Sequence, residues 1–239
     1  MSRQIIAIIM AILLNFSIFL LADNDFTDDK AIDEIIIKTD ELADDVISIV
    51  DGNFTIFYNN NKIKAEGPVK KSQKDGEWSI YYDSDGSKLM SKGIYRSDKK
   101  NGSWITYYPN GKIMMRATYW NNELTAQVSL FTEDGYPFAE IMHKNNMKNG
   151  VFRLYYPNGN PKEISMFKQD KRDGTQNLYH PNGKRKSIGP YKDGIKNGLW
   201  KYYYETGRLK SEGNYVKGEK SGKWKNYDEN EKLIDIEDY

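Results

Sequence analysis

Hydrophobic and polar positions recur along this chain with a period of about 24 residues. The fullest copy of the pattern reads Gly-x-Trp-x-x-Tyr-Tyr-Pro-Asn-Gly-Lys, followed by a second apolar stretch. A fixed period of this length is typical of one supersecondary unit stacked on itself. The pattern therefore predicts an elongated repeat array over residues 52–239. Its eight copies begin at Gly52, Gly76, Gly102, Ala126, Gly150, Gly174, Gly198 and Gly222.

The copy that begins at Gly102 shows how one unit is expected to fold. Residues 104–108 are aromatic and β-branched, which favours a short strand. Pro109-Asn110-Gly111 suits a tight turn, and residues 113–120 supply a second strand. Dipeptides such as Asn101-Gly102 are hairpin signals and are expected to form the second turn. The fold class predicted is all-β, an antiparallel meander of stacked β-hairpins with about 16 short strands.

Two aromatic columns recur inside the first strand of each copy. The third position holds tryptophan in four copies, at Trp78, Trp104, Trp200 and Trp224. The sixth position is aromatic in all eight copies, and strand alternation puts it on the opposite face. Columns filled this regularly are typical of structural packing, and stacking of a ligand on the rings is the alternative.

The N-terminus has the pattern of a targeting segment. Arg3 is followed by an apolar run over residues 5–21, broken by Asn15 and Ser17. This pattern predicts a signal peptide over residues 1–22, with cleavage after Ala22 and export of the rest of the chain to the periplasm, the cell surface or the medium. Because the apolar run is near the shortest length that spans a bilayer, an uncleaved membrane anchor is the alternative.

Residues 23–51 form an acidic arm that differs from the array in charge. The arm has eleven acidic and two basic residues, a net charge of −9, whereas the array has a net charge of +9. Apolar residues three and four apart over residues 29–50 predict an amphipathic helix that covers the first strand edge, and a strand over 46–50 is the alternative. The charge asymmetry fits an arm that docks on the array, an anionic partner, or two solvated surfaces of different sign.

The chain offers little for catalysis or cofactor binding. It has no cysteine, which excludes disulfides, thiolate metal sites and cysteine nucleophiles. His143 and His180 stand in columns that hold tyrosine in other copies, so both are interpreted as packing residues. No motif for a catalytic triad, a metalloprotease or a phosphate-binding loop is present. We therefore expect no catalytic, metal or cofactor site.

A basic residue two positions before most repeat starts is a candidate for partner binding. In stacked hairpins these residues are expected to line one rim and to attract anionic lipid, polysaccharide or protein. The alternative is that they keep the turns soluble and prevent edge pairing. The ladder consists of Lys74, Lys100, Lys148, Arg172, Lys196 and Lys220.

The fourth copy departs from the pattern and is a second candidate. Leu124 replaces the basic residue, and Tyr136 and Phe138 follow the first turn, with Trp120 just before the copy. These four residues predict an apolar patch for partner contacts, and simple drift of one repeat is the alternative.

The repeated phrase resembles the MORN repeat, in the variant found in bacterial proteins labelled YwqK-family antitoxins. The resemblance covers about four-fifths of the chain. It implies a hairpin array for association with proteins or membranes, without catalytic residues, and the antitoxin label implies neutralisation of a toxin by binding. Choline-binding cell-wall repeats share the Gly, Trp and Tyr-Tyr residues but are shorter, so a glycan-binding module is a further alternative.

Together these features predict an exported, non-enzymatic repeat protein that presents an extended β surface. The expected partner is a protein or an anionic envelope or membrane surface, and neither nucleic acid nor a small-molecule substrate is expected. An antitoxin-like neutraliser is the alternative, and a cell-wall or glycan-binding module is the second alternative.

Overall fold

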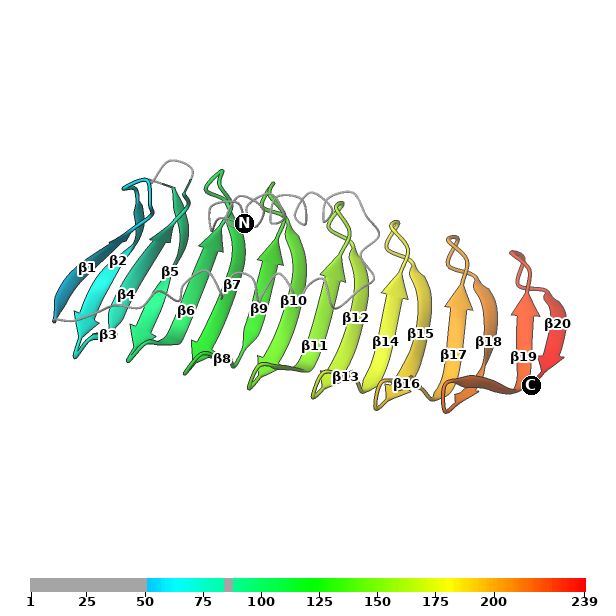
Figure 1. Ribbon diagram of the computed structural model, residues 1–239. Coiled ribbons are helices and arrows are strands. Elements are labelled where there is room, and N and C mark those ends of the chain that lie inside the picture. The colour runs from blue at the N-terminus through cyan, green and yellow to red at the C-terminus, as the bar shows by residue number, and fades with distance from the viewer. Residues whose placement is uncertain (1–50, 84–87) are drawn as a thin grey trace, which may run out of the picture. The chain divides into compact units, whose positions relative to one another are not determined.

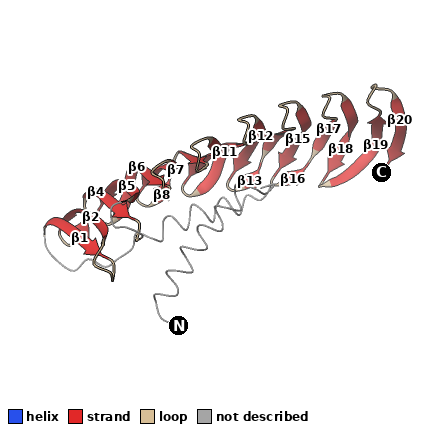
Figure 2. Cartoon of the chain, turned by 90° about the horizontal axis from the view of Figure 1, so that it is seen from above, coloured by secondary structure: helices blue, strands red, loops and turns tan. Residues whose placement is uncertain are grey.

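The computed structural model describes residues 51–83 and 88–239, which form a row of antiparallel hairpins (Figure 1). The expected signal segment, acidic arm and amphipathic helix lie outside these residues. Within them, no helix is long and apolar enough to cross a membrane. Seen from above, the described strands form a single row without a second layer (Figure 2).

The array contains twenty strand segments, numbered along the chain. The first ten are β1 (Gly52–Phe57), β2 (Ile63–Lys70), β3 (Gln73–Lys74), β4 (Gly76–Tyr81), β5 (Leu89–Arg96), β6 (Lys99–Tyr107), β7 (Ile113–Trp120), β8 (Glu123–Leu124), β9 (Gln127–Phe131) and β10 (Pro137–Lys144). The other ten are β11 (Met147–Tyr155), β12 (Pro161–Lys168), β13 (Lys171–Arg172), β14 (Gly174–Tyr179), β15 (Arg185–Lys192), β16 (Ile195–Lys196), β17 (Gly198–Tyr203), β18 (Leu209–Val216), β19 (Glu219–Tyr227) and β20 (Leu233–Asp238).

Pairing follows the order of the chain throughout, which makes the sheet a meander. The two-residue segments β3, β8, β13 and β16 pair with the same neighbour as the strand that follows each of them. Each is therefore the start of that strand, and the described chain contains sixteen strands in this sense. The predicted all-β meander of stacked hairpins is confirmed.

The first turn of the hairpin formed by β6 and β7 has the predicted position and chemistry. The Gly111 N–H donates to the Tyr108 carbonyl at 2.8 Å, and the Tyr108 N–H donates to the Lys112 carbonyl at 2.8 Å. Gly111 has φ of +84°, which an L residue adopts only with strain. Pro109 presets the turn and the glycine completes it, as expected.

The second turn lies four residues before the predicted dipeptides, so that prediction was wrong. In the hairpin of β10 and β11 the central turn residues are Asn145 and Asn146, with φ of +52° and +63°. Two successive positive φ values define a turn whose twist matches the flanking strands. The predicted residue Gly150 instead has φ of +123° and lies within a register shift, between the paired residues Lys148 and Phe152, so it belongs to a bulge inside the strand.

Hydrogen bonds between neighbouring hairpins hold this second turn. The Asp98 N–H donates to the Lys74 carbonyl at 3.0 Å, and the Lys74 N–H donates to the Asp98 carboxylate at 2.7 Å. Asn122 makes the same pair of bonds with Lys100 in the next hairpin. Each turn is therefore shaped by a residue about one repeat away as well as by its own sequence.

Large side chains on one side of the sheet, here called the aromatic face, form the core. The Trp column packs against a column of large residues near the end of each second strand. Tyr95, for example, has its ring 6.2 Å from that of Trp78 and 5.0 Å from that of Trp104, both edge to face. Because these contacts pass from hairpin to hairpin, the described residues form a continuous core within a single layer of strands.

A ladder of tyrosine hydroxyls connects the first turns. The hydroxyl of Tyr108 donates to the carbonyl of Phe131 in the next hairpin at 2.7 Å, and Tyr156 donates to Tyr179 at 2.8 Å. Burial raises the pKa of the Tyr108 hydroxyl to about 12, with a further contribution from the charge of Glu133.

Candidate functional site

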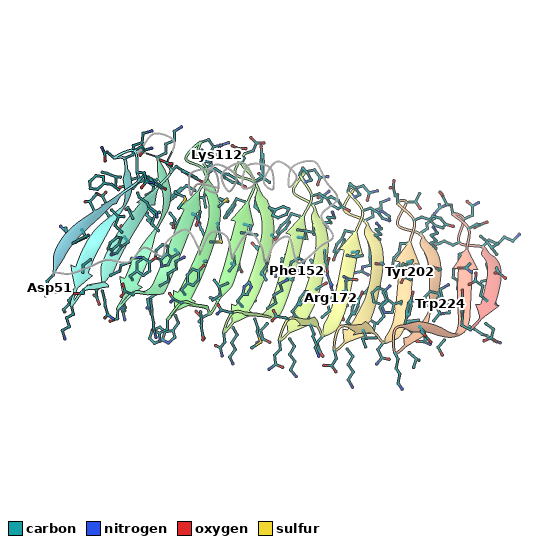
Figure 3. The ribbon with its side chains drawn as sticks, viewed as in Figure 1. Asp51, Lys112, Phe152, Arg172, Tyr202 and Trp224 are labelled. Carbon is teal, nitrogen blue, oxygen red and sulfur yellow. The ribbon has the colours of Figure 1, made fainter. Side chains whose placement is uncertain are left out.

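The predicted basic ladder lies on the aromatic face instead of on an open rim. Lys74, Lys100 and Lys148 are buried, and the other three members are partly buried. In Figure 3 the labelled Arg172 lies over the strands, beside the columns that contain Phe152 and Trp224, whereas Lys112 lies at the upper turns. The expectation of a solvent-facing line of charges is therefore corrected.

These cations lie over aromatic rings of their own hairpins. The Lys100 ammonium is 4.6 Å from the ring centre of Trp104 and 5.2 Å from that of Tyr119. Lys196 is 4.2 Å from the ring centre of Trp200. Such contacts contribute about 0.5–2 kcal/mol each and favour partial burial of the charge. The ladder thus stabilises the aromatic face, and its role in partner binding stays a prediction.

The last member of the ladder also bonds to polar groups. The Lys220 ammonium donates to the Tyr239 hydroxyl at 2.6 Å and lies 3.4 Å from the Glu237 carboxylate. The bond to Tyr239 is the largest cause of the raised pKa of Lys220. Lys220 is therefore held at the end of the array by both a ring and an acid.

A different set of basic residues is exposed at the second turns, on the face opposite the aromatic one. They occupy the last residue pair before each second turn, which lies along the lower edge of the row in Figure 1. Among the fourteen positions of these seven pairs, seven residues are basic and two are acidic. We call the basic set the basic rim: Lys70, Arg96, Lys99, Lys144, Lys168, Lys171 and Lys192.

The basic rim is a regular line of available charge. Successive hairpins are about 10 Å apart, because each adds two strands at roughly 4.8 Å per strand. Within the part of the chain that the structure describes, no ion pair is found for any of these seven side chains. The sequence signal was present, at the positions four residues and one residue before the predicted ladder, but it was not recognised because the second turn was misplaced.

The four residues of the apolar patch predicted at the fourth copy lie in separate places in the structure. Leu124 is buried on the aromatic face, in the column of the basic ladder. Trp120 is exposed at the second-turn end of β7, whereas Tyr136 is exposed in the first turn between β9 and β10. Phe138 is partly buried near that same first turn. These residues therefore do not form one patch, and any contact with a partner would involve them separately.

A polar cluster replaces the aromatic packing at the fifth and sixth copies. One carboxylate oxygen of the buried Glu163 accepts bonds from Ser165 at 2.6 Å, from the Arg172 guanidinium at 3.0 Å and from Gln176 at 2.8 Å. Gln176 stands in the Trp column. The cluster is internally satisfied, so we interpret it as part of the core.

The two histidines are in tyrosine columns, as the sequence indicated. The Nε2 atom of His180 is 3.1 Å from the Tyr203 carbonyl, which is the bond that tyrosine hydroxyls make in other hairpins. The buried His143 has its Nδ1 atom 3.2 Å from the Ile141 carbonyl. In the described ranges, no group of three or more His, Asp and Glu residues is placed to bind a metal ion.

Comparison with known families agrees with this geometry. A sequence model described as a MORN repeat variant matches residues 50–71, 100–121, 148–169, 172–193 and 196–217. Each match contains the two strands and the first turn of one hairpin. No curated protein matches the chain.

Proposed function

Because the chain is a MORN-repeat protein, we propose that its array is a non-enzymatic binding scaffold for an acidic partner protein. The observation that carries this proposal is the basic rim. Seven exposed basic residues lie in five of the seven residue pairs that flank the second turns, without ion pairs among the described residues. A line of like charge attracts a partner of opposite sign and accelerates its encounter with the array.

An anionic membrane is the second candidate partner. A row of basic side chains also attracts acidic lipid headgroups, at about 1 kcal/mol for each residue near the surface. The lysines and arginine of the basic rim lie along one edge of the sheet, so several of them could reach a flat surface together. The two candidates differ in the shape of the partner, which an experiment can separate.

Binding to polyglutamate, compared with vesicles that contain phosphatidylglycerol, tests this function. The rim variant Lys144→Ser/Lys168→Ser/Lys171→Ser removes three charges, and Arg185→Ser/Lys186→Ser/Lys223→Ser removes three exposed charges elsewhere. We expect polyglutamate binding that weakens as salt is added, and that the rim variant loses much more than its control. Equal losses in both variants would show that the rim is not a binding surface. Binding to vesicles alone would make the membrane the partner.

We further propose that the array acts outside the cytoplasm. Arg3 and the apolar run over residues 5–21 support export, and the acidic segment that begins at Asp23 suits a mature N-terminus. Cell fractionation and intact-mass measurement test this proposal. We expect a chain that begins at Asp23 in an exported fraction. A full-length chain in the membrane fraction would indicate an anchored array, and one in the cytoplasm would contradict export.

A further inference from the structure

A pocket of about 280 Å³ opens at the third repeat, on the face opposite the aromatic face. Its lining includes Ile94 from β5, Gly102 from β6, and Thr118 and Trp120 from β7. Arg96 of the basic rim also contributes to the lining. Asn101 and Thr125 complete the part of the lining that is polar, so the pocket combines small polar groups with Ile94, one large exposed aromatic side chain and one cation, and it lies beside the second turns.

In four of the described repeats a side chain covers the first glycine, whereas at Gly102, as at Gly52 and Gly222, this cover is missing. A β-carbon built on Gly76 would lie 2.4 Å from Pro68, and one built on Gly198 would lie 2.9 Å from Pro190. Methionines cover Gly150 and Gly174 in the same way. At Gly102 no atom lies within 4 Å of such a β-carbon. The residue in the covering position, Ile94, is 40% exposed and lines the pocket.

The exposure of Trp120 is the second unusual feature of the pocket. It is 60% exposed, whereas the other four tryptophans of the chain are at most 2% exposed. It occupies the strand position that holds Lys70, Arg96, Lys144, Lys168 and Lys192 in other hairpins. Tryptophan next to a pocket is typical of the residues that contribute most to binding energy at protein interfaces.

The charged residues around the pocket indicate which partner side chains would fit there. The cross-strand partner of Trp120 is Glu123, one of the two acidic residues among the rim pairs. At the second turn after β7 the rim therefore presents an indole and a carboxylate. Arg96 and Lys144 lie at the second turns on either side of it. A partner residue that faces Trp120 is therefore favoured when it is apolar. The partner residues that face the flanking cations are favoured when they are acidic.

We propose that the pocket at Trp120 anchors one large apolar side chain from an extended, acidic segment of the partner protein. The proposal rests on the scaffold function proposed above and names its anchoring site. In a polyproline II segment, which turns once every three residues and rises about 3.1 Å per residue, side chains three positions apart lie on the same side and about 9 Å apart, close to the spacing of successive hairpins. Acidic residues three positions before and after the apolar residue would then face Arg96 and Lys144.

The shape of the site favours a protein segment over a membrane. A flat lipid surface is contacted by aromatic side chains that project into it, whereas this indole borders a recess. A recess excludes water from an inserted side chain and so contributes to affinity. The membrane is therefore an outcome that the test must separate, and the segment is the occupant that the geometry supports.

The exposed indole provides its own readout. Because the other four tryptophans are buried, a change in fluorescence emission and in acrylamide quenching on binding will come mainly from Trp120. The probes are a synthetic peptide with Asp at every third position around a central Leu, and the same peptide with Ser in place of Leu. We expect the Leu peptide to shift Trp120 emission to shorter wavelength and to reduce its quenching. We expect the Ser peptide to bind at least tenfold more weakly, roughly the effect of one anchor residue.

The variant Trp120→Lys restores the basic residue of the regular repeats and separates the two proposals. If Trp120 is the anchor, this variant binds the Leu peptide about tenfold more weakly, although the rim gains a charge. If it binds the Leu peptide as tightly as the wild type or more tightly, the anchor is overturned while the rim function stands. If neither peptide binds, the anchor also fails. Protection of Trp120 by phosphatidylglycerol vesicles and not by peptides would assign the site to a membrane.

A fold control keeps this test decisive. Trp120 is exposed at the end of a strand, so its replacement is expected to leave stability nearly unchanged. Far-ultraviolet circular dichroism and urea unfolding of the Trp120→Lys variant should match the wild type. Trp120→Phe retains an aromatic side chain and is expected to preserve most of the affinity for the Leu peptide.

Discussion

The indole of Trp104 lies against Gly93 of the preceding hairpin, with no room for a side chain between them. A β-carbon built on Gly93 would come within 2.3 Å of the Trp104 ring. The two residues are cross-strand partners, and the ring nitrogen donates to the Ile94 carbonyl at 3.1 Å. The glycine therefore allows the ring to lie on the backbone and to bond to it at the same time.

The same relationship explains which residues occur together along the chain. Every other tryptophan of the column also lies against a glycine: Trp78 on Gly67, Trp200 on Gly189 and Trp224 on Gly213. Where the column holds a residue other than tryptophan, the residue eleven positions earlier is not glycine. It is Ala117 for Val128, Ile141 for Phe152 and Ser165 for Gln176. The size of the side chain in the column thus depends on the size of the side chain eleven positions earlier, because the two share one closely packed space.

Substitution of Gly93 by Ala should destabilise the array by about 1–3 kcal/mol, the usual cost of overpacking a filled site. The added methyl group would force the Trp104 ring off the backbone and break its hydrogen bond. The double variant Gly93→Ala/Trp104→Val recreates the pair that Ala117 and Val128 form in the same chain. Urea unfolding should therefore show that its loss is smaller than the sum of the two single losses.

The matched control for this pair is a glycine in an open turn. Gly111→Ala adds a methyl group where no atom lies within 4 Å, and its cost comes from positive φ alone. Combination of Gly111→Ala with Trp104→Val should give additive losses. Additivity for the Gly93 and Trp104 pair as well would contradict direct packing between them.

Much of the fold could be predicted because the determining signals are local and repeated. The Pro109-Asn110-Gly111 turn has a residue suited to each position, so its structure follows from three adjacent side chains. Alternation along the strand likewise placed the Trp column on one face. Repetition over eight copies supplied the number of strands.

The second turn was misplaced because two local signals compete in each repeat. Ser97 and Asp98 are common turn residues, but the Asn101-Gly102 dipeptide four residues later is the stronger hairpin signal. The Asp98 turn is also held by Lys74 of the preceding hairpin, a contact that local sequence does not reveal. Misplacing that turn put Lys100 on a rim, although its side chain lies over Trp104. The sequence did contain a signal for the packing of the Trp column. Each of its tryptophans occurs with a glycine in the preceding copy, but this pairing spans two repeats.

Removal of one hydroxyl from the tyrosine ladder should have a small, measurable cost. Tyr108→Phe deletes the 2.7 Å bond to the Phe131 carbonyl and should reduce the free energy of unfolding by about 1 kcal/mol. Tyr107→Phe removes a hydroxyl from the opposite, half-exposed column and should change stability by less than about 0.5 kcal/mol. Equal effects of the two variants in urea unfolding would argue against the ladder.

Alkaline pH should unfold the array through the buried tyrosines. Burial raises the pKa of Tyr108 to about 12 and also raises that of Tyr82, so the native state retains protons that the unfolded state releases. The stabilising contribution is present below pH 10, the ordinary tyrosine value, and is lost as pH rises towards 12. Unfolding followed from pH 8 to 12 should show this decline, and Tyr108→Phe should reduce its slope between about pH 10 and 12.

The buried carboxylate of Glu163 should matter more than a carboxylate at the surface. Glu163→Gln removes the charge that Arg172 and Gln176 contact, and should destabilise the array by about 2–3 kcal/mol because a partly buried guanidinium loses its partner. The control is Glu140→Gln, which breaks the more exposed pair with Arg153 and should cost at most about 1 kcal/mol. A larger loss for Glu140 than for Glu163 would contradict this ranking.

Substitution of Lys100 by Leu should separate the role of the aromatic-face cations from that of the basic rim. Leu124 already occupies the same column in the next hairpin and is buried there, so Leu should fit over Trp104. Apolar burial would offset the lost cation–π contacts, and we expect a change in unfolding free energy within about 1 kcal/mol. Polyglutamate binding should be nearly unchanged, because the side chain faces away from the rim, whereas Lys144→Ser should weaken it. If Lys100→Leu weakened binding as much as Lys144→Ser did, the partner surface would include the aromatic face, where Lys100 lies.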